Sequence, residues 1–179
     1  MIAIVYYSGS GHTARQAQLI ADGIASEPVS VLDCGALSES DWQVLDRADA
    51  IIFGAPTYMG SAAAGFKLFM DDSSDRWSEQ VWADKLAAGF TVATYASGDK
   101  LATLGQLAIF AAQHGMLWIG QKEIGPRGSD FDAINWQGSF LGLMATSSRN
   151  KAALLDQGDA DTARLFGARI EAAVKRWRL

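Results

Sequence analysis

The chain has 179 residues, 49% of them hydrophobic, which is enough for a domain with a sizeable core. Its formal net charge of −5 and lack of a basic stripe argue against nucleic acid as a partner, and its single cysteine, Cys34, excludes an internal disulfide or a zinc site built from cysteines. No apolar segment approaches the roughly 20 residues that a membrane-spanning helix needs, and the chain starts in a predicted strand rather than a secretion signal, so we expect a cytoplasmic protein.

Apolar runs of strand length alternate with helical patterns along the chain. Such alternation is typical of βαβ units, in which parallel strands form one sheet with helices on both faces. It predicts a single three-layer α/β/α domain over residues 1–179. The predicted strands span residues 2–7, 29–33, 48–56, 87–97 and 116–120. The predicted helices span residues 13–25, 38–47, 62–72 and 101–113, and a last helix is capped by Asp161.

Two helix starts carry capping signals. Thr13 and Gln16 have the spacing of a capping box at the first helix, and Ser38 or Ser40 can cap the second. Residues 121–156 follow neither a helical nor a strand pattern. We expect an irregular loop there that serves function or faces a partner.

The first strand leads into YYSGSGHTA, residues 6–14, which has the form of a phosphate-binding loop. A run of β-forming residues ends in glycines and hydroxyl side chains, and a helical pattern follows directly. A triphosphate P-loop is excluded because no lysine is near the loop. A magnesium-binding receiver domain is excluded because Tyr6, Tyr7 and Ser8 stand where its carboxylates would be needed.

Two kinds of phosphate ligand remain for this loop. Residues 9–14 match the dinucleotide fingerprint G-x-G-x-x-G/A, and Asp33 lies about twenty residues on, where a ribose-binding acid belongs. Hydroxyl donors favour a terminal phosphate monoester over a diester, because the monoester has three equivalent oxygens and more charge. Ser8, Ser10 and Thr13 supply three such hydroxyls, which favours a monophosphate. The structural alternative is a serine–glycine turn with an N-cap.

Two further strand ends carry the chemistry of a ring-binding pocket. In open α/β sheets the ligand lies outside the carboxyl ends of the strands. Residues 54–60, GAPTYMG, offer a hydroxyl, a flat ring and a polarizable side chain after the third strand. Residues 94–100, TYASGDK, are again aromatic, small and polar after the fourth. Together the three loops predict a pocket for a flat ring with a phosphorylated tail, as in flavin mononucleotide (FMN).

These segments resemble, in order and spacing, the WrbA-like branch of the flavodoxin-like NAD(P)H:quinone oxidoreductases. The resemblance is carried by YYSGSGHTA, by FGAPTYMG with FMDD and RW after it, by ASGDK and by AAQHGM, and more weakly by GSFLG and the last helix. It implies a flavodoxin-like fold with a five-stranded parallel sheet in the order 2-1-3-4-5. It also implies FMN as cofactor, NADH or NADPH as co-substrate, a quinone-like acceptor, and a homo-oligomer, either a dimer or a tetramer.

The resemblance assigns roles to individual residues. His114 matches a histidine near the ring that reaches a neighbouring subunit's site. The proposed hydride transfer needs no side chain as an obligatory acid, and His114 or Tyr58 could assist proton delivery. Trp77 matches a tryptophan that roofs the substrate space over the flavin. The phosphate would be held by Ser8, Gly9, Ser10, Gly11, His12 and Thr13, the ring lined by Pro56, Thr57, Tyr58, Met59 and Gly60, and the third flavin loop formed by Ser97, Gly98 and Asp99.

Simpler structural roles stay open for some of these residues. His114 and Gly115 also fit a helix C-cap. Trp77 also fits packing in a core or an interface. His12 also fits an ordinary surface position beside the phosphate loop.

Two departures from the family pattern concern the flavin itself. The third loop is shorter than in the family, and Asp99 and Lys100 replace glycines. Near the N1/O2 edge of the flavin, an acid would disfavour the anionic reduced ring and Lys100 would favour it, although the pair also fits a helix cap. Tyr58 and Met59 stand where the family more often has an arginine and an aromatic residue, which leaves the nicotinamide preference and the quinone fit open.

Three functions are consistent with these features. The leading hypothesis is an FMN-dependent oxidoreductase that transfers two electrons from NAD(P)H to a quinone or similar acceptor, by hydride transfer through flavin N5. The second is a flavodoxin-type carrier of single electrons, although such carriers are usually much more acidic than this chain. The third is an FMN-binding partner module without turnover.

Overall fold

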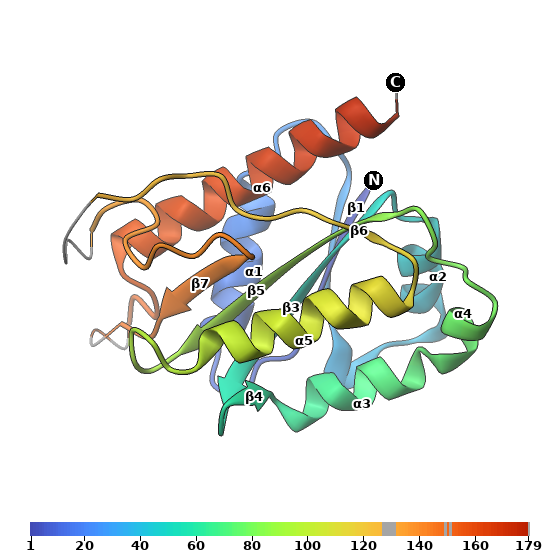
Figure 1. The fold of residues 1–179 in the computed structure, drawn as a ribbon, viewed down its shortest axis with the longest axis horizontal. Coiled ribbons are helices and arrows are strands. Elements are labelled where there is room, and N and C mark those ends of the chain that lie inside the picture. The colour runs from blue at the N-terminus through green and yellow to red at the C-terminus, as the bar shows by residue number, and fades with distance from the viewer. Residues whose placement is uncertain (127–131, 149, 151, 179) are drawn as a thin grey trace.

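A sheet of mainly parallel strands runs through the middle of the molecule (Figure 1). The computed structural model describes residues 1–179 except 127–131, 149, 151 and 179. The strands lie in the order β2-β1-β3-β5-β6, with β4 (Ser61–Ala62) paired to β3 and β7 (Leu143–Thr146) paired to β5, so the sheet has seven strands and not the predicted five. The order differs in numbering from the predicted 2-1-3-4-5 because the short antiparallel β4 is counted, and the predicted fold class is confirmed. Their bounds are β1 (Ile2–Tyr6), β2 (Val29–Asp33), β3 (Ala50–Tyr58), β5 (Leu86–Ala93) and β6 (Leu117–Trp118).

Two strands in series occupy the position beside β5. The first half of β5 pairs with β6 at Leu86 and Ala87, and residues 90–93 pair with β7 (Leu143–Thr146). The chain therefore leaves the sheet after β6 and returns to it at β7. The prediction of an irregular loop over residues 121–156 is wrong at β7, because a run of four residues is too short to show a strand pattern. Residues 127–131, 149 and 151 of that stretch lie outside the described residues.

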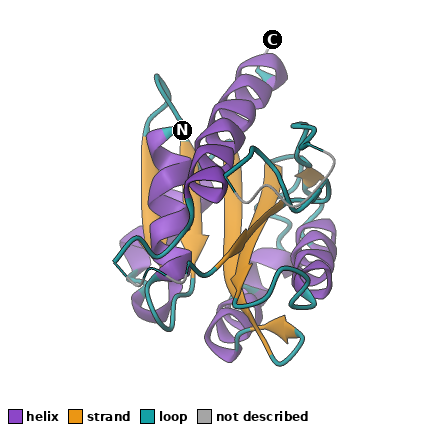
Figure 2. Cartoon of the chain, turned by 90° about the vertical axis from the view of Figure 1, so that its left-hand side faces the viewer, coloured by secondary structure: helices purple, strands orange, loops and turns teal. Residues whose placement is uncertain are grey.

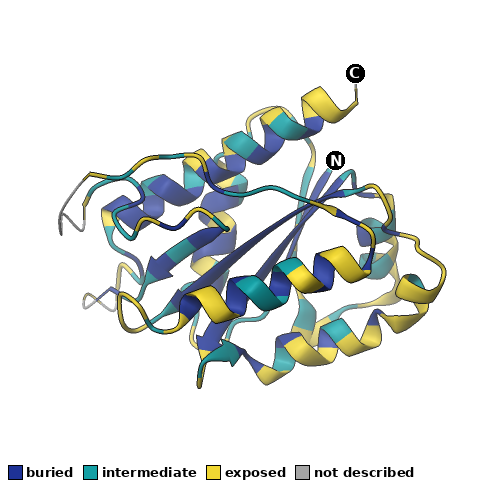
Figure 3. Ribbon diagram, in the orientation of Figure 1, coloured by how far each residue is buried: buried dark blue, intermediate teal, exposed yellow. Residues whose placement is uncertain are grey.

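Each face of the sheet has its own hydrophobic core, which gives the predicted three layers (Figure 2). The first core includes Phe90, Phe166 and Ile170, and the second includes Phe53 and Trp82. Figure 3 shows the buried residues along the strands and on the inward faces of the helices. None of the helices in the described part of the chain is long and apolar enough to cross a membrane. The helices are α1 (His12–Asp22) and α6 (Gln157–Trp177) on one face, and α2 (Glu39–Arg47), α3 (Ala64–Asp72), α4 (Ser74–Ser78) and α5 (Lys100–Gln113) on the other.

The first helix starts without the predicted capping box. α1 begins at His12, behind Gly11, whose φ of +89° is left-handed and which as a glycine has no side chain to cap the helix. Thr13 and Gln16 are instead buried in the first turns. The capping-box prediction is therefore wrong, and the first N–H groups of α1 are left for another acceptor.

Of the two other predicted helix caps, the one at α2 is confirmed and the one at α6 is wrong. Ser38 caps α2 in a reciprocal capping box with Asp41. The last helix begins at Gln157 and not behind Asp161, with Asp156 at the N-cap position. Its first turn is polar and therefore lacked the apolar period that marks the rest of the helix.

Glycines let α1 and α6 cross in direct backbone contact. A Cβ built on Gly23 would lie 2.0 Å from Arg164 O, and one built on Gly167 would lie 2.0 Å from Ile20 O. Real Cβ atoms do not approach a backbone atom so closely. The two helices would have to separate to admit a side chain at either position.

We expect Gly167→Ala to lower the free energy of unfolding by about 2–3 kcal/mol, because the new methyl group forces these helices apart. The matched control is Gly105→Ala within α5, where a new Cβ meets nothing within 4 Å. That change should raise the free energy of unfolding by about 0.5–1 kcal/mol through helix propensity. Urea denaturation of both variants checks this, and a Gly167→Ala protein as stable as wild type would contradict the close contact.

Candidate functional site

The carboxyl ends of the central strands and the N-terminus of α1 enclose a cavity of about 130 Å³. We call it the cradle. Its lining combines residues of the three predicted loops with others that the sequence did not indicate. The predicted members are Ser10, His12, Thr13, Pro56, Thr57, Tyr58 and Thr94, and the others are Val92, Ala93 and Ser147.

The first loop presents backbone N–H groups at the start of α1. Ser8 Oγ accepts hydrogen bonds from Gly11 N at 3.1 Å and Ala14 N at 3.2 Å, which folds the loop around the helix end. Within the described residues, the N–H groups of His12 and Thr13 donate to no protein acceptor. They point outward at the positive end of the helix dipole. This arrangement suits an anion.

The second loop closes over the first at Tyr58. A Cβ on Gly9 would lie 2.5 Å from Tyr58 Oη, so the phenol approaches the loop only because this residue is glycine. Met59 and Gly60, both at positive φ, turn β3 back into its antiparallel partner β4 (Ser61–Ala62). The side chain of Met59 is fully exposed and that of Tyr58 is 45% exposed. The turn thus presents a flat and a polarizable surface at the cradle.

Thr57 anchors the floor of the cradle. Its Oγ1 lies 2.8 Å from Thr91 Oγ1 on β5 and 2.8 Å from Thr103 Oγ1 on α5. All three side chains are buried. This threonine cluster, which the sequence did not indicate, fixes the spacing between the second and third loops.

The third predicted loop, residues 94–100, lines the cradle at Thr94 and not at Ser97, Gly98 or Asp99. Ser97, Gly98 and Asp99 form the turn before α5, and both Gly98 and Asp99 adopt a left-handed φ of 52°. The lining also contains Ser147. Ser147 was missed, because it follows the unpredicted β7.

The donors of the cradle fit a phosphate monoester, and the acid expected for a dinucleotide is used elsewhere. Asp33 accepts a hydrogen bond from Gly35 N at 2.9 Å and so caps the short 3₁₀ helix Cys34–Ala36. Hydroxyls and helix-end amides remain around the cavity. This set suits the terminal phosphate of a mononucleotide.

Comparison with known proteins decides the family. A profile of the NADPH-dependent FMN reductase family matches residues 42–125. The chain is 38% identical over 170 residues to "Flavodoxin FldP" of Pseudomonas aeruginosa (strain UCBPP-PA14), which covers 93% of this chain and 92% of that protein. It also resembles the crystal structure of the "flavodoxin, WrbA-like protein" from Agrobacterium tumefaciens, with a TM-score of 0.79, 38% identity and coverage of 98% and 97% of the two chains.

The chain belongs to the WrbA-like branch of the flavodoxin-like FMN-binding family. A more distant relative is an NAD(P)H dehydrogenase (quinone) of Solidesulfovibrio magneticus, 24% identical over 201 residues and matched over 99% of this chain and 98% of that protein.

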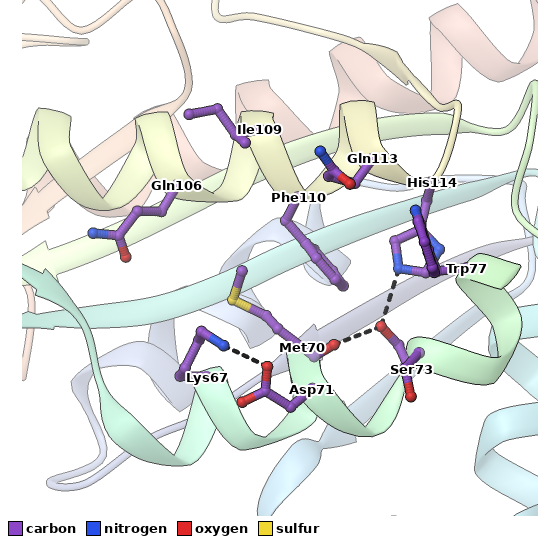
Figure 4. Close-up of a pocket in the computed structure, with 11 residues that line it drawn as sticks. Lys67, Met70, Asp71, Ser73, Trp77, Gln106, Ile109, Phe110, Gln113 and His114 are labelled. Atoms are coloured by element: carbon purple, nitrogen blue, oxygen red, sulfur yellow. Dashed lines mark hydrogen bonds and ion pairs between the residues drawn. The ribbon is translucent and has the colours of Figure 1, made fainter.

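In this flavodoxin-like chain, His114 and Trp77 lie away from the cradle. They line a second cavity of about 510 Å³ between α3, α4 and α5 (Figure 4). α5 starts next to the third loop and runs back along the sheet for 14 residues, or roughly 20 Å, before it reaches His114. Within one chain, the structure therefore does not bring His114 or Trp77 to Tyr58.

The imidazole of His114 is buried and makes one hydrogen bond among the described residues. His114 Nε2 lies 3.0 Å from Ser73 Oγ, which also lies 2.8 Å from Met70 O (Figure 4). Nδ1 has no hydrogen-bond partner among the described residues. The ring packs against Trp82 and Phe110, with centroids 4.5 Å and 4.8 Å away.

Burial lowers the pKa of His114 to about 4. The side chain is 1% exposed and caps the end of α5, with Gly115 following at a φ of +69°. A neutral, enclosed imidazole is a poor proton donor near neutral pH. The catalytic role of His114 stays a prediction. Its observed position is the C-cap of α5, the structural alternative that the sequence also allowed.

We expect His114 to make folding stability depend on pH between 6.5 and 4. In this window the unfolded chain binds a proton at His114 and the folded chain does not, so stability falls as the pH falls, by up to about 3 kcal/mol. In His114→Leu this contribution is lost. Urea denaturation of wild type and variant at pH 7, 5.5 and 4.5 should show a smaller decline for the variant, and equal declines would contradict the neutral buried state.

Proposed function

We propose that this protein is an FMN-dependent oxidoreductase that passes two electrons from NADH or NADPH to a quinone-like acceptor. The observation that carries the proposal is the cradle, where the unpaired N–H groups at the N-terminus of α1, the hydroxyls of Ser10 and Thr13 and the exposed turn at Tyr58 adjoin one cavity. The name of the matching family and the names of several relatives support the same activity.

The residues of the first loop would hold the phosphate. The N–H groups of His12 and Thr13 and the hydroxyls of Ser10 and Thr13 supply neutral donors, and the dipole of α1 supplies positive potential. Ser8 has a supporting part, because its oxygen already accepts two loop amides. Gly9 and Gly11 allow the close packing and the left-handed turn that shape the loop.

The second and third loops would orient the ring. Pro56, Thr57, Tyr58, Met59 and Gly60 would lie along it, and the turn Ser97–Gly98–Asp99 would border its other side. The chemistry that FMN supplies when bound is hydride acceptance at N5 and delivery of two electrons to the acceptor. The protein's contribution is to hold donor and acceptor in stacking geometry, with Tyr58 Oη placed to move a proton at the exposed edge of the cradle.

Exposed apolar residues support the proposal of a homo-oligomer. Leu68, Trp77, Leu101 and Ile109 on α3, α4 and α5 are between 47% and 66% exposed. A second copy of the chain would cover them and would place Trp77 near another copy's cradle. The predicted substrate role of Trp77 belongs to that arrangement.

An electron carrier is the second candidate. It is favoured by the 38% identity to a protein named flavodoxin. A carrier would use the same cradle without binding a nicotinamide. Reduction experiments separate these two functions.

We expect Ser10→Ala to weaken FMN binding about tenfold, because a hydrogen bond to a charged phosphate is lost. The affinity for riboflavin, which has no phosphate, should change less than twofold. Ser10 is exposed, so the fold should tolerate the change. Quenching of flavin fluorescence measures both affinities. Equal weakening for the two flavins would contradict a phosphate contact at Ser10.

The activity is tested by anaerobic mixing of the FMN-loaded protein with NADH or NADPH and then with a quinone. Loss of the visible absorbance of the oxidised flavin with either nicotinamide, and full recovery on adding quinone, is the expected result. A carrier would stay oxidised with both nicotinamides and accept single electrons from a chemical reductant. A protein that binds FMN and transfers no electrons would be a binding module.

A further inference from the structure

Lys100, the first residue of α5, is a fully buried lysine next to the cradle. Its side chain is 0% exposed. Nζ donates to Ala145 O at 3.0 Å, to Thr146 Oγ1 at 3.1 Å and to Gln137 Oε1. Three acceptors satisfy all three protons of an ammonium group. Lys100 therefore joins the start of α5 to the end of β7 and to the segment that precedes it.

A buried carboxylate lies behind two of these acceptors. Asp159, in the first turn of α6, is 2% exposed. It accepts from Thr146 N at 2.7 Å and from Gln137 Nε2 at 3.2 Å. Trp136 Nε1 donates to the same carboxylate at 2.9 Å. Gln137 and Thr146 thus bridge the two charges, each accepting from the ammonium and donating to the carboxylate.

Burial and the opposite charges act in opposite directions on the pKa values of Lys100 and Asp159. Burial lowers the pKa of Lys100 to about 8, and the Asp159 carboxylate opposes that shift. Burial raises the pKa of Asp159, and the N–H of Thr146 and the charge of Lys100 oppose it. At neutral pH the ammonium form of Lys100 persists, with its donors directed at fixed acceptors.

The network ends at the third loop. Lys100 N donates to Ser97 O at 3.1 Å, which closes the left-handed turn at Gly98 and Asp99. The loop is tight, since a Cβ on Gly98 would lie 2.7 Å from the Cβ of Ala93. A strained turn of this kind persists only where its surroundings hold it.

We propose that Lys100 is a positioning residue that fixes the third loop, residues 94–99, in the conformation that receives the flavin ring. This inference rests on the proposed function as an FMN-binding protein. Apolar residues would fill the same space at lower desolvation cost, whereas a fully satisfied polar network selects one arrangement of its neighbours. The loop is thereby ordered before the flavin binds, and binding loses less conformational entropy.

Lys100→Met tests the proposal, since methionine keeps most of the length and removes the charge and the donors. In the flavin-free protein at pH 7, amide hydrogen exchange in residues 94–99 should accelerate about tenfold, while exchange in β1 and α1 stays unchanged. Affinity for FMN and for riboflavin should fall alike, about tenfold, because the third loop borders the ring and not the phosphate. Lys122→Met, at an exposed lysine paired with Glu123, is the matched control and should change neither measurement.

Thr146→Val covers the case in which Lys100→Met does not fold. It removes one acceptor of the ammonium and keeps the backbone N–H that Asp159 accepts. Exchange in residues 94–99 and both flavin affinities should change in the same direction, by about threefold. Unchanged exchange in residues 94–99, or an acceleration spread evenly over the sheet, would overturn the positioning role. Failure of the proposed function is distinguishable, because the wild-type protein would then bind neither flavin while the exchange experiment still reports on the loop.

Discussion

The divided partner of β5 is the constraint on which the rest of this structure depends. β6 pairs with the first half of β5 and β7 with the second half, so the chain must leave the sheet and return beside the carboxyl end of β5. That return delivers Ser147 to the cradle and Thr146 to the buried ammonium of Lys100. A continuous fifth strand would provide the same edge pairing without bringing Gln137 into the interior. The divided strand therefore links the fold to the third loop.

A second constraint is the start of α1, where the N-cap residue is a glycine. A side chain at the N-cap position typically stabilises a helix by about 1 kcal/mol, and α2 has such a cap at Ser38 while Gly11 at the N-cap of α1 supplies none. The hydroxyl of Ser8 accepts only Gly11 N and Ala14 N, so the amides between them remain available. A bound phosphate would supply the missing acceptor. The same feature thus lowers the stability of the free protein and creates its anion site.

The sequence predicted the parts of the fold that have long-range periodicity. β1, β3 and β5 are continuous apolar runs buried on both faces, and their alternation with helices predicts a parallel sheet, whereas the order of the strands was implied by the family resemblance. β7 escaped prediction because its four residues become a strand only through the free edge of β5. In the site, Ser10 to Thr13 and Pro56 to Tyr58 were predicted from hydroxyls and glycines near strand ends. The threonine cluster and the partners of Lys100 are tertiary contacts between distant segments, and no local pattern indicates them.

The two ends of α5 show why burial outweighs the helix dipole in this protein. The dipole favours a cation at a helix C-terminus and disfavours one at an N-terminus, by about 0.3–1 kcal/mol. His114 stands at the favourable end, yet its pKa falls to about 4, which corresponds to roughly 3 kcal/mol against the charged form. Lys100 stands at the unfavourable end and keeps its proton at neutral pH. The difference is the number of hydrogen-bond partners. The ammonium of Lys100 has three acceptors, whereas the imidazole of His114 has one partner among the described residues, the hydroxyl of Ser73. Hydrogen-bond satisfaction, and not position along the helix, therefore decides which buried base is charged.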